Sequence, residues 1–78
     1  MVDLKQTLLD IAKAIVDSPD DVQVTMEEDG RSVTLTLTVA PDDMGMVIGR
    51  GGRIAKAIRT VMKAASAGCG KKVRVDIE

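Results

Sequence analysis

Residues 47–54 read Val-Ile-Gly-Arg-Gly-Gly-Arg-Ile, and this stretch decides how the fold of the chain is interpreted. A Gly-x-x-Gly turn at 49–52 separates an apolar dipeptide from a helical pattern that starts near Arg53. Glycines and the start of a helix leave backbone N–H groups that no side chain shields. The sequence therefore predicts a turn at which an anion, above all a phosphate, can approach the main chain closely.

Helices are predicted on both sides of this turn. Pro-Asp-Asp at 41–43 ends a strand and offers an N-cap to a short helix over Met44–Ile48. The longer helix begins beside the last glycine of the turn and runs to about Ala67, with Gly68 as its C′ residue. Its predicted inward positions are Ile54, Ile58, Val61 and Ala65, and its polar face carries Arg53, Lys56, Thr60 and Lys63.

The remaining sequence predicts one more helix and the strands. A helix spans about Leu4 to Asp17, with Asp3 as its N-cap, and the Ser-Pro-Asp sequence at 18–20 stops it. Asp29-Gly30 is a strong signal for a two-residue hairpin loop. Alternation of apolar and polar residues predicts strands whose apolar faces are Val22, Val24 and Met26; Val33, Leu35, Leu37 and Val39; and Val73, Val75 and Ile77.

These elements follow the order α-β-β-α-α-β, which predicts an α+β fold in a single domain of residues 1–78. The two hairpin strands are antiparallel, and the helical crossover makes the last strand parallel to the second. The prediction is therefore a three-stranded mixed sheet. Because each strand has one apolar and one polar face, all the helices are expected on one side of this sheet.

Charged residues are divided unevenly along the chain, although the net charge is only −1. Residues 1–43 hold three basic and ten acidic residues, a net charge of −7, whereas residues 44–78 hold eight basic and two acidic residues, a net charge of +6. No acidic residue lies between Asp43 and Asp76. A basic half around the glycine turn favours a polyanionic ligand, and an ordinary solvated surface is the alternative.

The composition excludes several classes of protein. The chain has no His and a single cysteine, Cys69, which excludes an internal disulfide and a His/Cys zinc site. Cys69 is interpreted as a small residue in the turn before the last strand. No set of nucleophile, acid and base suits an enzyme, and no cofactor or metal is predicted. No apolar run reaches the roughly 20 residues of a membrane span, and no secretory signal begins the chain, so a cytoplasmic location is expected.

The glycine turn differs from two other phosphate-binding loops. It lacks the Gly-Lys-Ser/Thr of a Walker A loop, and it follows a short helix rather than the strand of a dinucleotide fingerprint. The sequence Ile48-Gly49-Arg50-Gly51-Gly52-Arg53-Ile54 instead resembles the signature of KH (K-homology) domains, and the element order is similar to their bacterial type II arrangement. The small size and the run from Ile54 to Val61 resemble the single-KH bacterial proteins of the KhpA family. Gly51 stands where that family often has a polar residue.

The resemblance carries functional expectations. Proteins of the KhpA family are regarded as RNA-binding proteins and RNA chaperones, associated with a second KH protein of the KhpB (Jag) type and with control of cell envelope growth and cell length. The resemblance implies that this chain binds single-stranded RNA, and the sequence itself predicts neither an enzyme nor a membrane partner. A homodimer or a heterodimer with a KhpB-type protein is also expected, and Val61, Met62 and several alanines of the long helix could let two helices approach.

The RNA-binding site is predicted at the glycine turn and the start of the helix that follows it. Its residues are Val47, Ile48, Gly49, Arg50, Gly51, Gly52, Arg53, Ile54 and Lys56. Backbone amides, Arg50 and Arg53 would meet the phosphates of about four nucleotides, with Lys56 at the flank of the strand. Bases are expected in an apolar groove bounded by Val47, Ile48, Ile54 and the strand at Leu37 to Val39. Because the chain has no aromatic residue to stack on bases, binding should be modest, weakly selective and sensitive to salt.

Two other functions remain open from the sequence. In the first, the domain is a protein–protein interaction module in which the glycine turn is only a connector, Ile48 and Ile54 belong to the core, and the basic residues form a solvated helix face. In the second, it is a small subunit of an enzyme that binds an anion or a mononucleotide. The missing catalytic set makes the second alternative the weaker one.

Overall fold

The structure is a computed structural model that describes residues 3–68 and 70–78, and its elements follow the predicted α-β-β-α-α-β order. The helices are α1 (Leu4–Ile15), α2 (Met44–Ile48) and α3 (Arg53–Ala65), and the strands are β1 (Gln23–Asp29), β2 (Ser32–Thr38) and β3 (Lys72–Ile77). Short 3₁₀ turns lie between them, namely η1 (Pro19–Asp21), η2 (Pro41–Asp43) and η3 (Arg50–Gly52). The α+β class is therefore confirmed, and so is the short helix predicted over 44–48.

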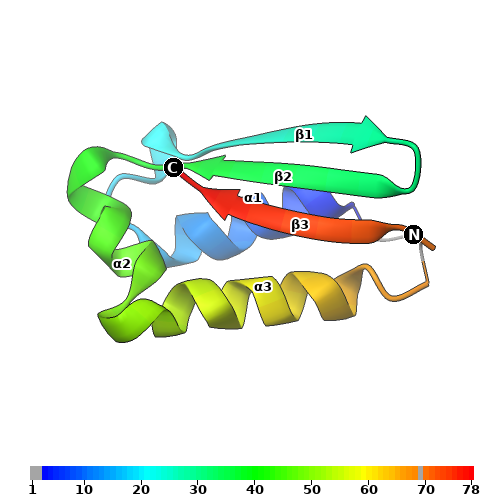
Figure 1. The fold of residues 1–78 in the computed structure, drawn as a ribbon. Coiled ribbons are helices and arrows are strands. Elements are labelled where there is room, and N and C mark those ends of the chain that lie inside the picture. The colour runs from blue at the N-terminus through cyan, green and yellow to red at the C-terminus, as the bar shows by residue number, and fades with distance from the viewer. Residues whose placement is uncertain (1–2, 69) are drawn as a thin grey trace.

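The described strands form one mixed sheet with the order β1-β2-β3. β1 pairs with β2 in the antiparallel direction, and β3 pairs with β2 in the parallel direction, as the crossover through α2 and α3 requires. Figure 1 shows the helices of the described segments on one side of this sheet. The helical layer covers the apolar face of the strands, and the threonines of β2 lie on the opposite face.

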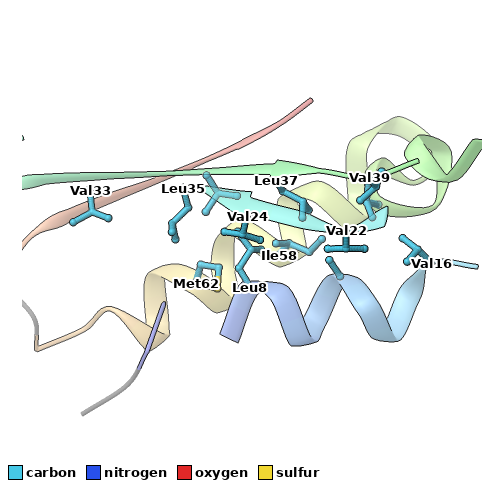
Figure 2. Close-up of a cluster of buried hydrophobic side chains, with 13 residues drawn as sticks. Leu8, Val16, Val22, Val24, Val33, Leu35, Leu37, Val39, Ile58 and Met62 are labelled. Atoms are coloured by element: carbon cyan, nitrogen blue, oxygen red, sulfur yellow. The ribbon is translucent and has the colours of Figure 1, made fainter. Parts of the chain in front are cut away.

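The core lies between the sheet and the helices. Every apolar residue of the alternating β2 segment is buried, as its period of two predicts. α1 contributes Leu8 and Ala12, and α3 contributes Ile58 and Met62. Figure 2 shows the side chains of Leu8, Ile58 and Met62 meeting those of the strands in one layer. The fully buried large side chains are Leu8, Leu35, Leu37, Val47 and Met62.

α1 begins as predicted and ends earlier than predicted. Asp3 caps it, because the N–H of Gln6 donates to Asp3 Oδ1 at 3.1 Å. The helix ends at Ile15 rather than at Asp17, and Val16 is already extended with ψ 160°. Pro19 disfavours a helical conformation in the residue before it, and the chain turns through η1 instead.

The inward face of α3 differs from the prediction. Ala55, Ile58 and Met62 are buried, whereas Ile54 and Val61 are 38% and 49% exposed. The helix carries apolar residues on two neighbouring faces, so its periodicity alone does not decide which of them turns to the sheet. It also ends at Ala65, two residues before the predicted end.

Two smaller differences concern the hairpin. Asp29 pairs with Ser32, so the two-residue loop is Gly30-Arg31 rather than Asp29-Gly30. Gly30 has φ +59° and supplies the positive φ that such a loop needs at its first position. Met26 was predicted to be inward but is 43% exposed, because β1 is an edge strand with a neighbour on one side only.

Asp43 links two distant segments instead of capping α2. Its carboxylate makes no capping bond to the helix and is 3% exposed. Asp43 Oδ2 accepts a hydrogen bond from the backbone N–H of Ser18 at 3.0 Å. The bond ties the turn after α1 to the turn before α2 and thereby fixes the start of the segment that carries the glycine turn.

Two further expectations concern a membrane span and the single cysteine. None of the helices in residues 3–68 and 70–78 combines the length and the hydropathy needed to cross a membrane. The interpretation of Cys69 as a small turn residue lies outside the described residues.

Candidate functional site

Gly49 is the point at which α2 ends and the glycine turn begins. Its N–H closes α2 by donating to the carbonyl of Gly45 at 2.9 Å. Its backbone, with φ +77° and ψ 171°, lies in a region that essentially only glycine adopts. A Cβ at Gly49 would also lie 2.9 Å from both Cβ and the backbone N of Ile54 and closer still to Cγ1 of that side chain. Both the backbone conformation and the contact with Ile54 therefore require glycine at this position.

The other two glycines of the turn are required for one reason only. Gly51 and Gly52 have φ values of +65° and +80°, but a Cβ on either would meet no atom within 4 Å. They let the chain reverse tightly in η3 without steric cost. The turn is closed by its own backbone, because Gly52 N–H donates to the Gly49 carbonyl at 3.1 Å and Arg53 N–H donates to the Arg50 carbonyl.

Two backbone amides of the turn lack a hydrogen-bond partner within residues 3–68 and 70–78. Among the described residues, no carbonyl or side chain accepts a hydrogen bond from the N–H of Arg50 or of Gly51. Both residues are exposed. The prediction of bare amides is therefore right for these two and wrong for Gly52 and Arg53, whose N–H groups are used inside the turn. Adjacent free amides at an exposed glycine turn suit an anionic oxygen.

Of the apolar residues predicted to line the site, some are exposed beside the turn and the others are buried in the core. Ile48 and Ile54 are 37% and 38% exposed and flank the turn on its two sides. Val47 is fully buried, so its predicted contact with a ligand is wrong. Leu37 and Val39 are buried too, so the predicted apolar groove over β2 does not exist. β2 is the central strand, and the helical layer covers its apolar face completely.

Basic side chains surround the turn and continue along α3. Arg50, Arg53 and Lys56 are exposed and form no ion pair with another described residue. Lys56 lies three positions after Arg53, and Lys63 lies seven positions after Lys56, so the three residues share one face of α3. The predicted basic residues are therefore brought together on one side of the turn, where their charges add.

A groove between α3 and β3 was not predicted from the sequence. It has a volume of about 390 Å³ and is lined by Arg59, Lys63, Val73, Arg74, Val75 and Asp76. Arg59 fixes its geometry, because the guanidinium Nε donates to the backbone carbonyl of Val75 at 3.2 Å. The available signal was the polar side of the last strand, whose Lys72 and Arg74 alternate with Val73 and Val75. Only the packing of α3 against β3 joins that side to the helix.

Comparison with known proteins places this arrangement in a family. The family model described as "KhpA/KhpB, KH domain" matches residues 5–77. The chain belongs to the KhpA/KhpB KH family. It is 57% identical over 74 residues to the RNA-binding protein KhpA of Clostridium acetobutylicum, covering 95% of this chain and 99% of that one. It is 50% identical to the RNA-binding protein KhpA of Halalkalibacterium halodurans, and the match covers 95% of this chain and 97% of that one. It is 49% identical to the RNA-binding protein KhpA of Streptomyces coelicolor, and the match covers 95% of this chain and 90% of that one.

Solved structures support the KH fold independently. A crystal structure of Aquifex aeolicus Era bound to GDP and AlF₄⁻ matches with a TM-score of 0.68 at 15% identity. A crystal structure of Era in complex with MgGDPNP and nucleotides 1506–1542 of 16S ribosomal RNA matches with a TM-score of 0.66 at 14% identity. Both matches cover 95% of this chain, but only 29% and 28% of the Era chains. At this identity the likeness concerns the fold alone.

Family membership confirms three predictions from the sequence. The resemblance to the KhpA family is right, and so is the type II KH topology. KhpA/KhpB KH domains are not an enzyme family, which agrees with the missing catalytic set. Within the described ranges, moreover, no three His, Cys, Asp or Glu side chains gather to hold a metal ion.

Proposed function

We propose that this KH domain binds single-stranded RNA, with the strand lying across the glycine turn. The observation that carries the proposal is the pair of amides at the exposed residues Arg50 and Gly51, which have no partner among the described residues, with Arg53 and Lys56 beside them. The names of the KhpA relatives, which are RNA-binding proteins, and the RNA in one Era structure support the same ligand.

The contacts follow from the chemistry of the turn. One phosphate oxygen accepts the two free N–H groups, and the side chains of Arg50 and Arg53 neutralise the charge of that phosphate and its neighbour. Ile48 and Ile54 offer short apolar walls to the sugar and base. The bases then face the α3–β3 groove rather than β2. About four nucleotides occupy such a clamp.

Binding of this kind is modest and tolerant of sequence. The chain has no aromatic residue, so the stacking energy of about 1–3 kcal/mol per base in other single-strand binders is missing. Backbone amides and charged side chains contact phosphates, which carry no sequence information. Such contacts suit an RNA chaperone or a post-transcriptional regulator in the cytoplasm. The family resemblance links that role to control of the cell envelope and cell length.

The test separates the charge of the turn from its shape. Gly51→Asp places a carboxylate beside the free amides, whereas Gly51→Asn has nearly the same size and no charge. Both fit, because Gly51 faces open space and Asn and Asp tolerate positive φ. With a short fluorescein-labelled RNA in an anisotropy titration, Gly51→Asp should weaken binding at least about tenfold relative to Gly51→Asn, as for one lost charge-assisted hydrogen bond of about 1.5–3 kcal/mol. Equal affinities of the two variants would remove the turn from the RNA site.

A second function, self-association, is favoured by a separate observation. α3 carries an exposed apolar face of Ala57, Val61 and Ala64 between its core face and its basic face, and Val61 is 49% exposed. Small residues on one face let two helices approach closely. This face could join two copies of the chain, or the chain and a KH protein of the KhpB type, and so bring two glycine turns together.

Sedimentation equilibrium tests the helix face. Val61→Asp should shift any dimer to monomer, whereas Thr60→Asp adds the same charge on the neighbouring basic face and should leave the dimer in place. A wild-type chain that stays monomeric at high concentration, alone and mixed with a KhpB-type KH protein, would argue against this second function.

A further inference from the structure

A second basic groove lies at the end of the molecule opposite the glycine turn. It has a volume of about 1080 Å³, and its walls come from the β1–β2 hairpin, the end of α3 and the start of β3. Figure 1 shows η3 and this hairpin at opposite ends of α3. The hairpin is held against the third strand, because Lys72 N–H donates to the carbonyl of Arg31 at 2.8 Å.

The charge of this groove has one sign. Its described lining includes five basic side chains and no acidic one, the basic residues being Arg31, Lys63, Lys71, Lys72 and Arg74. Two of them are engaged, since Lys71 pairs with Glu28 at 2.9 Å and Arg74 pairs with Asp76 at 3.1 Å. Arg31, Lys63 and Lys72 are exposed and have no ion-pair partner among residues 3–68 and 70–78.

The rest of the lining suits a backbone rather than a base. Small residues and main chain at Ser66, Ala67, Gly68 and Gly70 form much of the surface. Because the chain has no aromatic residue, this surface offers no ring on which a base could stack. The chemistry that fits it is a flexible polyanion whose negative charges recur at short intervals.

The groove is continuous with the proposed RNA site. It shares Lys63, Val73 and Arg74 with the smaller α3–β3 groove, which reaches Arg59. From there Lys56 and Arg53 lead along α3 back to the glycine turn. The 13 residues of α3 span about 20 Å at ~1.5 Å per residue. At the ~3.4 Å spacing of a stacked strand this distance corresponds to about six nucleotides, and to fewer in a stretched strand.

We propose that the groove of Arg31, Lys63 and Lys72 is a second phosphate-binding zone for the same RNA strand. The inference rests on the proposed RNA binding at the turn and extends it. The turn holds about four nucleotides, and the groove holds the phosphates that follow, so one domain covers about eight to ten nucleotides of RNA. The added contacts increase affinity and leave sequence preference unchanged.

Oligouridine RNAs of about four, eight and twelve nucleotides test this footprint in anisotropy titrations. Wild-type affinity should rise steeply between the shortest and the longer RNAs, with one protein bound per eight-nucleotide strand. Arg31→Gln combined with Lys72→Gln changes two residues that line only the larger groove, and it should abolish most of the rise and leave binding of the shortest RNA unchanged. The loss of two phosphate contacts should reduce the slope of log affinity against log salt concentration by about 1.4. This corresponds to an affinity for the longer RNAs about 25-fold weaker at ~0.1 M salt.

The control carries the same charge change elsewhere. Lys5→Gln with Lys13→Gln alters two exposed lysines of α1 and should keep the full rise with length. The proposal is overturned if wild type shows no rise, if the groove and control variants bind the longer RNAs equally, or if the rise reflects a second protein on the strand. Failure of the turn site would give different results. Either the wild type would bind no RNA of any length, or Gly51→Asp would bind RNA as tightly as Gly51→Asn.

Discussion

Replacing Gly49 with alanine should destabilise the domain far more than the same change at its neighbours. The backbone of Gly49, with φ +77° and ψ 171°, costs a non-glycine residue about 1–3 kcal/mol. The new methyl group would also overlap the side chain and backbone N of Ile54, which adjoin the position of its Cβ. Overpacking of this kind costs about 1–3 kcal/mol, because Ile54 lies in the first turn of α3 and its backbone cannot move without the helix.

The two costs together lower the free energy of unfolding by about 2–6 kcal/mol. The free energy of unfolding of the wild-type domain is expected to be only about 4–12 kcal/mol, from ~0.05–0.15 kcal/mol for each of its 78 residues. Gly49→Ala should therefore lower Tm by at least about 8 °C, at ~4–8 °C per kcal/mol for a domain of this size. Far-ultraviolet circular dichroism during thermal and urea unfolding is the suitable assay, because the chain has no aromatic residue for intrinsic fluorescence.

Two other glycines serve as matched controls. Gly51→Ala carries the cost of positive φ without a clash, so its free energy of unfolding should fall by about 1–2 kcal/mol. Gly45→Ala lies in α2 with open space around it and should gain about 0.5–1 kcal/mol. If Gly49→Ala were no less stable than Gly51→Ala, contact with Ile54 would not be what requires glycine at position 49.

Three further predictions concern the link between turns, the core and the ligand. Asp43→Ala removes the buried acceptor of Ser18 N–H and should cost about 1–3 kcal/mol in urea unfolding, whereas the exposed Asp42→Ala should stay within ~0.5 kcal/mol. Leu35→Ala should cost about 2–5 kcal/mol and Met26→Ala much less, since only Leu35 is fully buried; equal losses would contradict the described core. Raising salt from about 50 to 200 mM should weaken binding of a four-nucleotide RNA about 20-fold if three cations contact phosphates, and affinity independent of salt would exclude such contacts.

Much of the fold could be predicted because local patterns agree with the tertiary structure. The strict alternation of β2 identifies its buried face, and the glycine turn separates α2 from α3. α3 was the exception. Its apolar residues lie on two adjacent faces, and the contact between Gly49 and Ile54 holds Ile54 at the turn rather than in the core. That contact depends on tertiary geometry, which a periodic pattern does not contain.

The candidate site could be predicted in its position but not in its detail. The glycines and arginines of the turn were identified from their spacing. Which amides are free depends on how η3 closes, since its own carbonyls use the N–H groups of Gly52 and Arg53. The α3–β3 groove joins residues that are distant in sequence, such as Arg59 and Val75, so only packing brings them together. Val47 was assigned to the site because it adjoins the turn in sequence, although its side chain lies in the core.

RNA binding at the turn requires that the free N–H groups of Arg50 and Gly51 hold an RNA phosphate. Backbone amide NMR of the ¹⁵N-labelled domain during titration with a short single-stranded RNA tests it most directly. The amide resonances of these two residues should shift most and saturate together, while the amides of α1 stay in place. Saturable RNA binding that leaves both resonances unmoved and shifts amides elsewhere would contradict it.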